Sequence, residues 1–302
     1  MGKNAKAFGS GGPATMDEQR KEWRGGGREV SLRSNTTSSD KAMEYAGGFE
    51  NGAPGTSGTS IFDPVLCELV YRWFCPPGGL VLDPFAGGSV RGIVASKLGR
   101  RYVGVDLRAE QIEANREQAG RICGDPMPTW HCGDSLGLAE VCGDVEADLV
   151  FTCPPYADLE VYSDDPQDIS TMEYPAFLAA FRTIVGLACE RLKPDRFACI
   201  VVGDIRDKAG NYRNFVGDTV KAFADAGLLL YNDAVLVTAV GSLPIRVGRQ
   251  FAAGRKLGKT HQNILVFVKG DGKAATTAIG DVDTEAALQR MADMDLTPQL
   301  DS

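Results

Sequence analysis

The fold of this chain is decided by residues 80–89, which read LVLDPFAGGS. The apolar run 80–82 indicates a strand that is buried on both faces, and an aspartate and a proline end it. Gly87 and Gly88 let the backbone turn sharply and let a ligand come close. Helical spacing of apolar residues begins after Ser89. A buried strand, a glycine turn and a helix in this order indicate the first unit of a parallel α/β sheet.

The same alternation continues along the chain. Asp63 and Pro64 form an N-cap followed by proline at the first helical position, which predicts a helix over 64–73. Further helices are expected at 89–98, 108–118, 174–192 and 214–226. Strands are expected at 80–82, 102–105, 129–132, 149–151, 197–202, 235–238 and 264–268. The last two strands have no helical pattern between them, so they are expected to pair in an antiparallel manner. The sequence therefore predicts an α/β, Rossmann-like fold with a mostly parallel seven-stranded sheet and an antiparallel edge strand.

Composition divides the 302 residues into three parts. Residues 1–58 are rich in Gly, Ser and Thr and are expected to be a flexible N-terminal arm and linker. The packed domain is expected over 59–270. A C-terminal tail over 271–302 follows, with a short amphipathic stretch at 286–294.

Bulk properties exclude several classes of protein. No apolar run is long enough to span a bilayer and no secretory signal begins the chain, so we expect a soluble, cytoplasmic protein without membrane contact. None of the eight cysteines forms a CxxC pair, which argues against a zinc site and a disulfide framework. The net charge of −8 argues against a uniformly basic, general nucleic-acid binder.

Two acidic residues follow the next strands, Asp106 after 102–105 and Asp134 after 129–132. Ligands of open α/β sheets bind at the carboxyl ends of the strands. A carboxylate there can accept both hydroxyl hydrogen bonds of a ribose, and Asp134 could accept from an adenine amino group. The GxGxxG pattern is absent, which disfavours NAD. These positions predict a nucleoside-type cofactor other than NAD.

The fourth strand ends in Thr152, Cys153, Pro154, Pro155 and Tyr156. Two prolines fix the backbone and direct its carbonyls, and the tyrosine offers a flat face. The amino group of a base is a poor nucleophile until acceptors bind both of its hydrogens. Rigid carbonyls beside an aromatic ring suit that task for a base taken out of its stack.

Two other acidic features are less specific. The acidic stretch 158–168 that follows is interpreted as a solvated loop, with no metal site expected. Asp204 could line the base site or cap the next turn.

A basic segment without acidic residues lies between the last two strands. We expect it to be a flexible glycine-containing loop that contacts phosphates, with support from Arg206, Lys208 and Arg213. Its cations are Arg246, Arg249, Arg255, Lys256 and Lys259. His261 is interpreted as structural.

Two motifs resemble those of the DNA methyltransferases that act on exocyclic amino groups. Residues 81–89 are similar to the family's cofactor motif, D-P-F-x-G-S/T-G, with the second glycine and the serine exchanged. Residues 153–156 are similar to its catalytic motif, D/N/S-P-P-Y/F, except for Cys153. Residues 60–64 resemble the segment that closes over the cofactor's methionine part.

The resemblance implies a class I methyltransferase domain that uses S-adenosylmethionine and flips an adenine or cytosine out of double-stranded DNA. It implies a setting in restriction-modification or in a phage. The catalytic residues would be Cys153, Pro154, Pro155 and Tyr156. The cofactor-binding residues would be Phe62, Asp63, Asp83, Pro84, Phe85, Ala86, Gly87, Gly88, Ser89, Asp106 and Asp134. Among these, Asp83 would lie near the methionine amino group and Asp106 would bind the ribose.

Three readings of the function stay open. The first is methylation of DNA at adenine N6 or cytosine N4. The second is an RNA or pyrimidine-C5 methyltransferase that uses Cys153 as its nucleophile. The third is a non-catalytic DNA-binding protein on a methylase fold. No segment has the length of a target-recognition region, so a short target or a protein partner is expected.

Overall fold

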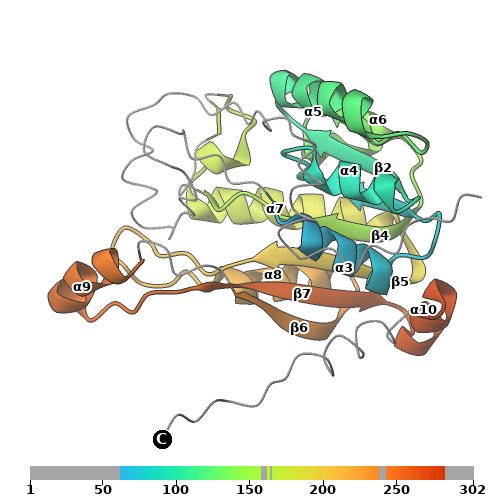
Figure 1. The fold of residues 1–302 in the computed structure, drawn as a ribbon. Helices are drawn as coiled ribbons and strands as arrows, with labels where there is room; N and C mark the ends of the chain where they lie inside the picture. The colour runs from blue at the N-terminus through green and yellow to red at the C-terminus, as the bar shows by residue number, and fades with distance from the viewer. Residues whose placement is uncertain (1–61, 158–161, 164, 238–242, 283–302) are drawn as a thin grey trace, which may run out of the picture.

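The computed structural model describes residues 62–157, 162–163, 165–237 and 243–282 (Figure 1). Its strands are β1 (Leu80–Asp83), β2 (Arg101–Asp106), β3 (Thr129–Cys132), β4 (Ala147–Thr152), β5 (Leu192–Val202), β6 (Leu229–Val237) and β7 (His261–Lys269). Its α-helices are α3 (Pro64–Phe74), α4 (Val90–Lys97), α5 (Ala109–Ile122), α6 (Leu138–Cys142), α7 (Tyr174–Glu190), α8 (Phe215–Asp225), α9 (Leu243–Gly254) and α10 (Gly272–Ile279). Two 3-10 turns, η1 (Ser135–Gly137) and η3 (Ile169–Thr171), complete the described elements.

All seven strands form one sheet in the order β3-β2-β1-β4-β5-β7-β6. The pairs from β3 to β5 are parallel, and β7 is antiparallel to both β5 and β6. This arrangement confirms the expected Rossmann-like class I methyltransferase fold. The antiparallel strand itself lies one position inside the edge, because β7 enters between β5 and β6.

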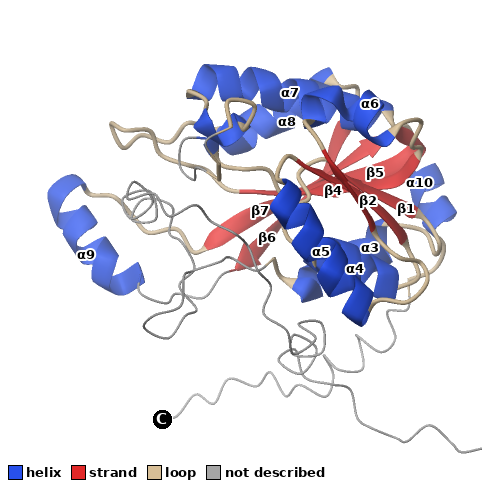
Figure 2. Ribbon diagram, turned by 90° about the horizontal axis from the view of Figure 1, so that it is seen from above, coloured by secondary structure: helices blue, strands red, loops and turns tan. Residues whose placement is uncertain are grey.

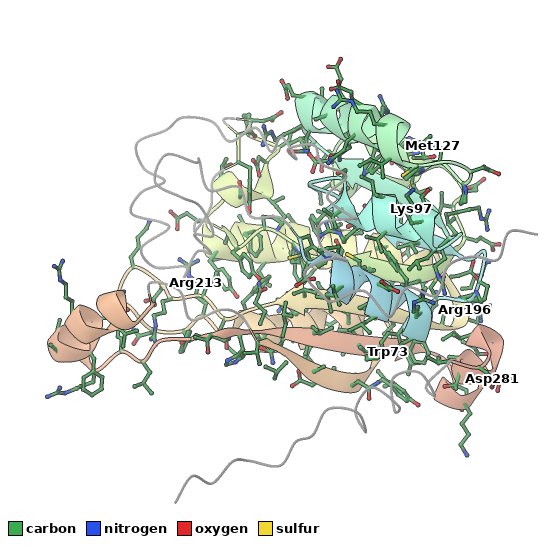
Figure 3. All side chains as sticks on the ribbon, viewed as in Figure 1. Trp73, Lys97, Met127, Arg196, Arg213 and Asp281 are labelled. Carbon is green, nitrogen blue, oxygen red and sulfur yellow. The ribbon has the colours of Figure 1, made fainter. Side chains whose placement is uncertain are left out.

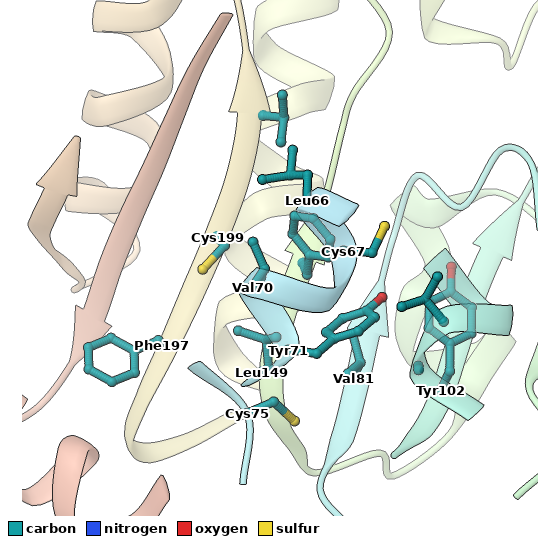
Figure 4. Packing of buried hydrophobic residues seen from close by; sticks show 14 of the residues in the cluster. Leu66, Cys67, Val70, Tyr71, Cys75, Val81, Tyr102, Leu149, Phe197 and Cys199 are labelled. Carbon is teal, nitrogen blue, oxygen red and sulfur yellow. The ribbon is translucent and has the colours of Figure 1, made fainter. Parts of the chain in front are cut away.

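Helices cover both faces of the sheet (Figure 2). One hydrophobic cluster lies under α3, α4, α5 and α10, and includes Val70, Tyr71 and Leu149 (Figure 4). The other lies under α7 and α8, where Phe223 stacks on Phe267 with ring centroids 4.2 Å apart. The central strands β1 and β4 are buried along their whole length, as their unbroken apolar runs predict.

Local signals account for most boundaries. The Asp63 side chain accepts hydrogen bonds from the amides of Val65 and Leu66, and Pro64 begins α3, as the sequence predicts. All eight cysteines are free, and four of them are buried. No helix of the described parts is long and apolar enough to cross a bilayer.

The structure corrects two expectations about the later half of the chain. Part of the basic segment is helical, because α9 spans Leu243–Gly254 where a flexible loop was expected. Leu243, Val247 and Phe251 recur at helical spacing, which is typical of a helix, and the internal Gly248 costs only about 1 kcal/mol.

Helix α10 also extends the packed unit beyond residue 270, since Ala275 and Ile279 belong to the core. The amphipathic stretch 286–294 and the N-terminal arm 1–58 lie outside the described residues.

Candidate active site

The turns that carry the two sequence motifs lie at one edge of the sheet. β1, β2, β3 and β4 are parallel neighbours, so their carboxyl ends meet there. Figure 3 helps to locate this edge, because Arg213, which follows the end of β5, lies on the α9 side of the molecule. Arg196, near the start of β5, lies toward the opposite end. The two motifs, far apart in the sequence, therefore lie close together in the fold.

The glycine turn after β1 is fixed by backbone hydrogen bonds to the neighbouring strand. The amide of Ala86 donates to the carbonyl of Val105 at 3.0 Å. Gly87 has a φ of +50°, a conformation that glycine adopts without a steric penalty. A Cβ at Gly104 would stand 2.8 Å from the Cβ of Ala86, so the turn lies directly against β2.

Asp106 holds the same turn from the end of β2. One of its carboxylate oxygens accepts from the amide of Gly87 and the other from the amide of Arg108, each at 2.9 Å. Burial raises the pKa of this carboxyl, although the two backbone hydrogen bonds oppose the shift. Each oxygen has a second acceptor position beyond these bonds. Asp106 can therefore bind the turn and still accept from a ligand's hydroxyl groups.

Asp83 is sealed within the protein. Its side chain is fully buried. One carboxylate oxygen accepts from the Thr152 hydroxyl at 2.6 Å and the Phe85 amide at 3.2 Å. The other accepts from the Arg91 Nε at 2.6 Å and the Tyr102 hydroxyl at 2.7 Å. Burial and the adjacent carboxylate both raise the pKa of Tyr102, which keeps its hydroxyl a donor.

Arg91 is a residue of this site that the sequence analysis missed. It lies on α4, and its second terminal nitrogen donates to the carbonyls of Phe85 at 2.7 Å and Ala86 at 2.9 Å. Its guanidinium also lies over the ring of Phe62, 4.6 Å from the centroid, and interacts electrostatically with Cys153. Burial, the largest influence, would lower its pKa, but the Asp83 carboxylate together with the neighbouring Tyr102 and Cys153 raises the pKa overall. The available signal was an arginine on an otherwise apolar helix face directly after an acidic strand end.

The Cys153-Pro154-Pro155-Tyr156 stretch follows β4 without a break. Cys153, Pro155 and Tyr156 are half-buried, and Pro154 is buried. The hydroxyl of Tyr156 accepts from the Nε2 of Gln262 on β7 at 2.6 Å. The Tyr156 ring meets Phe215 edge-on, with centroids 6.2 Å apart. Gln262 is a second residue that sequence reasoning missed, since no motif marks it.

The remaining expected cofactor residues have local partners. Ser89 is buried and its hydroxyl donates to Gln118 at 2.6 Å. Asp134 caps the turn η1 by accepting from the amide of Leu136 at 2.8 Å. Pro84 is buried, and its carbonyl accepts from the Ser135 hydroxyl at 2.6 Å. These bonds hold the turns after β1 and β3 together at one edge.

Asp204 and the acidic stretch after Tyr156 have structural partners where they are described. Asp204 accepts from the amide of Val216 at 3.2 Å, which agrees with the capping alternative. Asp168 caps η3 through the amide of Ser170 at 2.9 Å. Among the residues placed by the structure, no three His, Cys, Asp or Glu side chains converge as metal ligands. Residues 158–161 and 164 lie outside the described part.

The basic segment stands beyond this edge. α9 projects from the β6–β7 hairpin, apart from the sheet (Figures 1 and 2). Arg249 and Arg255 are exposed, and Arg255 lies over the Phe251 ring at 5.0 Å. Lys256 is half-buried. So is Lys259, whose pKa is lowered by burial against the opposing charge of Asp204. Arg246 belongs to α9 by its backbone, and its side chain is not described.

Other cations that were expected on this face have partners of their own. Arg206 lies over the Tyr212 ring at 3.8 Å, and Arg213 lies over the Tyr174 ring at 4.7 Å. Lys208 is 3.5 Å from the carboxylate of Glu173. The ring contacts orient Arg206 and Arg213 in the loop after β5, whereas the Lys208–Glu173 pair is exposed and adds little.

Comparison with known proteins places the strongest likeness on the first half of this site. Residues 62–117 match the family model described as DNA methylase. The type II methyltransferase M2.DpnII of Streptococcus pneumoniae is 42% identical over 53 residues, which is 18% of this chain and 20% of that protein. M1.MboII of Moraxella bovis is 45% identical over 47 residues, 16% of this chain and 18% of its own length. The chain thus matches about a fifth of the length of these curated relatives.

Solved structures give a broader and weaker likeness. TrmN from Thermus thermophilus has a TM-score of 0.46 and 16% sequence identity, over 69% of this chain and 49% of that one. The fold assignment rests on the sheet order itself. The sequence likeness to the DNA methylase family model is confined to residues 62–117, which contain α3, the glycine turn, Arg91 and Asp106.

Proposed function

We propose that this protein transfers a methyl group from S-adenosylmethionine to the exocyclic amino group of adenine (N6) or cytosine (N4) in a base flipped out of double-stranded DNA. One observation carries the proposal. The glycine turn, which lies in the segment that matches the DNA methylase model, follows β1, and the Pro154-Pro155-Tyr156 stretch follows the adjacent strand β4. The hydrogen bond from Thr152 to Asp83 joins the ends of these two strands. A cofactor at the first turn would therefore face a base held at the second.

The residues at the glycine turn fit such a cofactor. Gly87 and Gly88 carry no side chain, and Asp106 has remaining acceptor capacity for a ribose diol. The cofactor would supply a methyl group on a positively charged sulfur. Phe62 at the start of α3 and Asp134 after β3 flank the same edge, so they are the further residues that we assign to cofactor binding.

The second turn fits the handling of a planar amine. The carbonyls of the Cys153-Pro154-Pro155 backbone are directed by the prolines, and they can accept both amino hydrogens. That pairing localises the nitrogen lone pair and readies it for attack on the methyl group. The Tyr156 face would stack on the flipped base. Thr152, which immediately precedes this stretch, is buried, and its hydroxyl donates to Asp83.

The basic segment supports DNA as the substrate. Arg249 and Arg255 are exposed beyond the carboxyl edge, and no acidic residue occurs between 246 and 261. Local clustering of cations against a net charge of −8 is typical of a phosphate-binding surface. We assign Arg246, Arg249, Arg255, Lys256 and Lys259 to contacts that position the protein on the backbone without reading bases.

Nucleoside mass spectrometry of DNA and RNA, isolated separately from cells that express the protein, tests the proposal. N6-methyladenine or N4-methylcytosine above the level in vector-only cells is the expected result. 5-Methylcytosine, or a methylated RNA nucleoside, would instead support the Cys153 nucleophile. An unmodified DNA that the purified protein still binds would support the non-catalytic reading.

The variant Cys153→Ser separates the two chemistries. A thiolate nucleophile cannot be replaced by serine without loss of turnover, whereas amino methylation needs no covalent bond to the enzyme. We expect Cys153→Ser to retain methyl transfer within about tenfold of wild type. Its readout is the rate of methyl incorporation into duplex DNA with saturating cofactor.

A further inference from the structure

The buried carboxylate of Asp83 connects four elements of the molecule. It receives Thr152 from the end of β4, Tyr102 from β2 and Arg91 from α4, and it lies itself at the end of β1. We call Asp83, Arg91, Tyr102 and Thr152 the Asp83 cluster. All four side chains are buried. Thr152 is the residue immediately before the Cys153-Pro154-Pro155-Tyr156 stretch, so the cluster reaches both motifs.

The acceptor capacity of Asp83 is used within the protein. A carboxylate offers about four lone-pair positions, and Asp83 meets four donors at 2.6, 2.6, 2.7 and 3.2 Å. No acceptor position is left for the ammonium group of a cofactor. This differs from the role that the family resemblance implies for the aspartate of this motif.

Arg91 extends the cluster to the backbone of the glycine turn. The guanidinium that pairs with Asp83 also binds the carbonyls of Phe85 and Ala86, and it carries the ring of Phe62 on its face. One cation therefore contacts the turn and the residue that precedes α3. Charge-assisted hydrogen bonds in a buried site are short and directional, which makes them suited to fixing distances.

We infer that Asp83 and Arg91 are positioning residues that hold the catalytic loop at a fixed distance from the cofactor turn, with Thr152 as the connecting group. This inference rests on the proposed function. Removal of the connection should let the loop shift while the cofactor turn, still held by Asp106 and Arg91, keeps its shape. Misplacement by about 1 Å is enough to slow a reaction about 100-fold.

The variant Thr152→Val tests the connection, because valine has nearly the same shape and lacks the hydroxyl. Thr152→Ser restores a hydroxyl. Thr219→Val is the matched control, since Thr219 is also fully buried and its hydroxyl donates to the carbonyl of Phe215 within α8. All are assayed below their unfolding temperatures.

For Thr152→Val we expect kcat to fall about 10- to 100-fold while the cofactor Kd stays within about threefold of wild type. Thr152→Ser and Thr219→Val should stay within about threefold in both. Equal loss of kcat and cofactor affinity in Thr152→Val would mean that the cluster forms part of the cofactor site. An unchanged kcat would mean that the hydroxyl does not position the loop.

Amide hydrogen exchange supplies a readout that does not need a methylated product. In Thr152→Val the peptide that contains Cys153, Tyr156 and Ala157 should exchange about tenfold faster, with no such change in Thr219→Val. Unchanged exchange would overturn the inference. If wild type methylates neither DNA nor RNA but the exchange result holds, the proposed function fails while the mechanical role of the cluster stands.

Discussion

Asp83 and Asp106 end neighbouring parallel strands, yet they differ in how the protein uses them. Asp83 is fully buried and meets three side-chain donors and one amide, including a cation. Asp106 is half-buried and meets only two amides, those of Gly87 and Arg108. The position of an aspartate at a strand end therefore does not decide whether it binds a ligand. What decides is how many donors the rest of the fold supplies.

The same distinction applies more widely at this edge of the sheet. The polar atoms of the buried Asp83 cluster form hydrogen bonds within the protein. In contrast, Arg249 in α9 and Arg255 just after it are exposed to solvent. Tyr156 lies between these extremes, half-buried and held by Gln262. Removal of a buried, hydrogen-bonded group should change stability and geometry, whereas removal of an exposed group should change ligand binding. The expected effects therefore decrease from the buried groups to the exposed ones.

The largest effect is expected on stability. Asp83→Asn removes the counter-charge of buried Arg91, and loss of one partner of a buried pair costs about 3–5 kcal/mol. Asp106→Asn should change the free energy of unfolding by about 1 kcal/mol or less, because its hydrogen bonds are to two amides and burial already disfavours its charge. Urea unfolding followed by circular dichroism measures both. Equal losses in the two variants would erase the contrast between the aspartates.

The second effect is on cofactor affinity. If Asp106 binds the ribose as proposed, Asp106→Ala removes two hydroxyl acceptors, each worth about 1.5 kcal/mol, so the Kd for S-adenosylmethionine should rise about 100-fold with the fold intact. Isothermal calorimetry gives the value, and circular dichroism controls for folding. An affinity equal to that of wild type would remove Asp106 from the cofactor site.

Acidification offers a check of the same carboxylate. Since burial raises the pKa of Asp106, the folded state binds its proton more tightly than the unfolded chain does. Ionisation of this group therefore costs stability above its folded pKa, and that cost disappears as the pH falls through it. Cofactor affinity should move in the opposite direction, because the protonated carboxyl loses acceptor capacity. Asp106→Asn should lack this part of the pH dependence.

The third effect is on turnover. Gln262→Leu deletes the donor to the Tyr156 hydroxyl, and we expect kcat to fall about tenfold, the equivalent of one hydrogen bond of about 1.4 kcal/mol. Because Gln262 acts through Tyr156, the double variant with Tyr156→Phe should be no slower than Tyr156→Phe alone. Asn263→Leu is a matched control, as its amide donates to Asp233 instead. Additive losses in the double variant would contradict the pairing.

The sequence alone predicted a mostly parallel seven-stranded sheet and the carboxyl ends of its strands as the place where the motifs meet, but it did not predict the order of the strands. Apolar runs such as 149–151 and turn residues such as Gly87 carry that information locally. Gln262 escaped because its partner Tyr156 is 106 residues away in the chain. Arg91 is only eight residues from Asp83, but nothing in the sequence shows that its side chain turns back to that carboxylate. The segment of α9 was predicted to be a loop because of its glycines, and its short run of apolar residues at helical spacing was overlooked.

The smallest effect belongs to the most open groups. Arg249→Gln with Arg255→Gln should leave folding and cofactor affinity unchanged, since both side chains are exposed beyond the active-site edge. If the two arginines contact phosphates, each releases about one counterion on binding, so the slope of log affinity against log salt should fall by roughly 1 to 2 units. The change should be the same on two duplexes of unrelated sequence, because phosphate contacts carry no base information.

The control variant combines Lys97→Gln with Arg101→Gln. It removes the same charge from exposed positions near the opposite ends of the strands, and it should leave the slope as it is. Equal slopes for wild type and the Arg249→Gln, Arg255→Gln variant would show that these two arginines do not contact the DNA backbone. The exposed cations would then have no part in DNA binding.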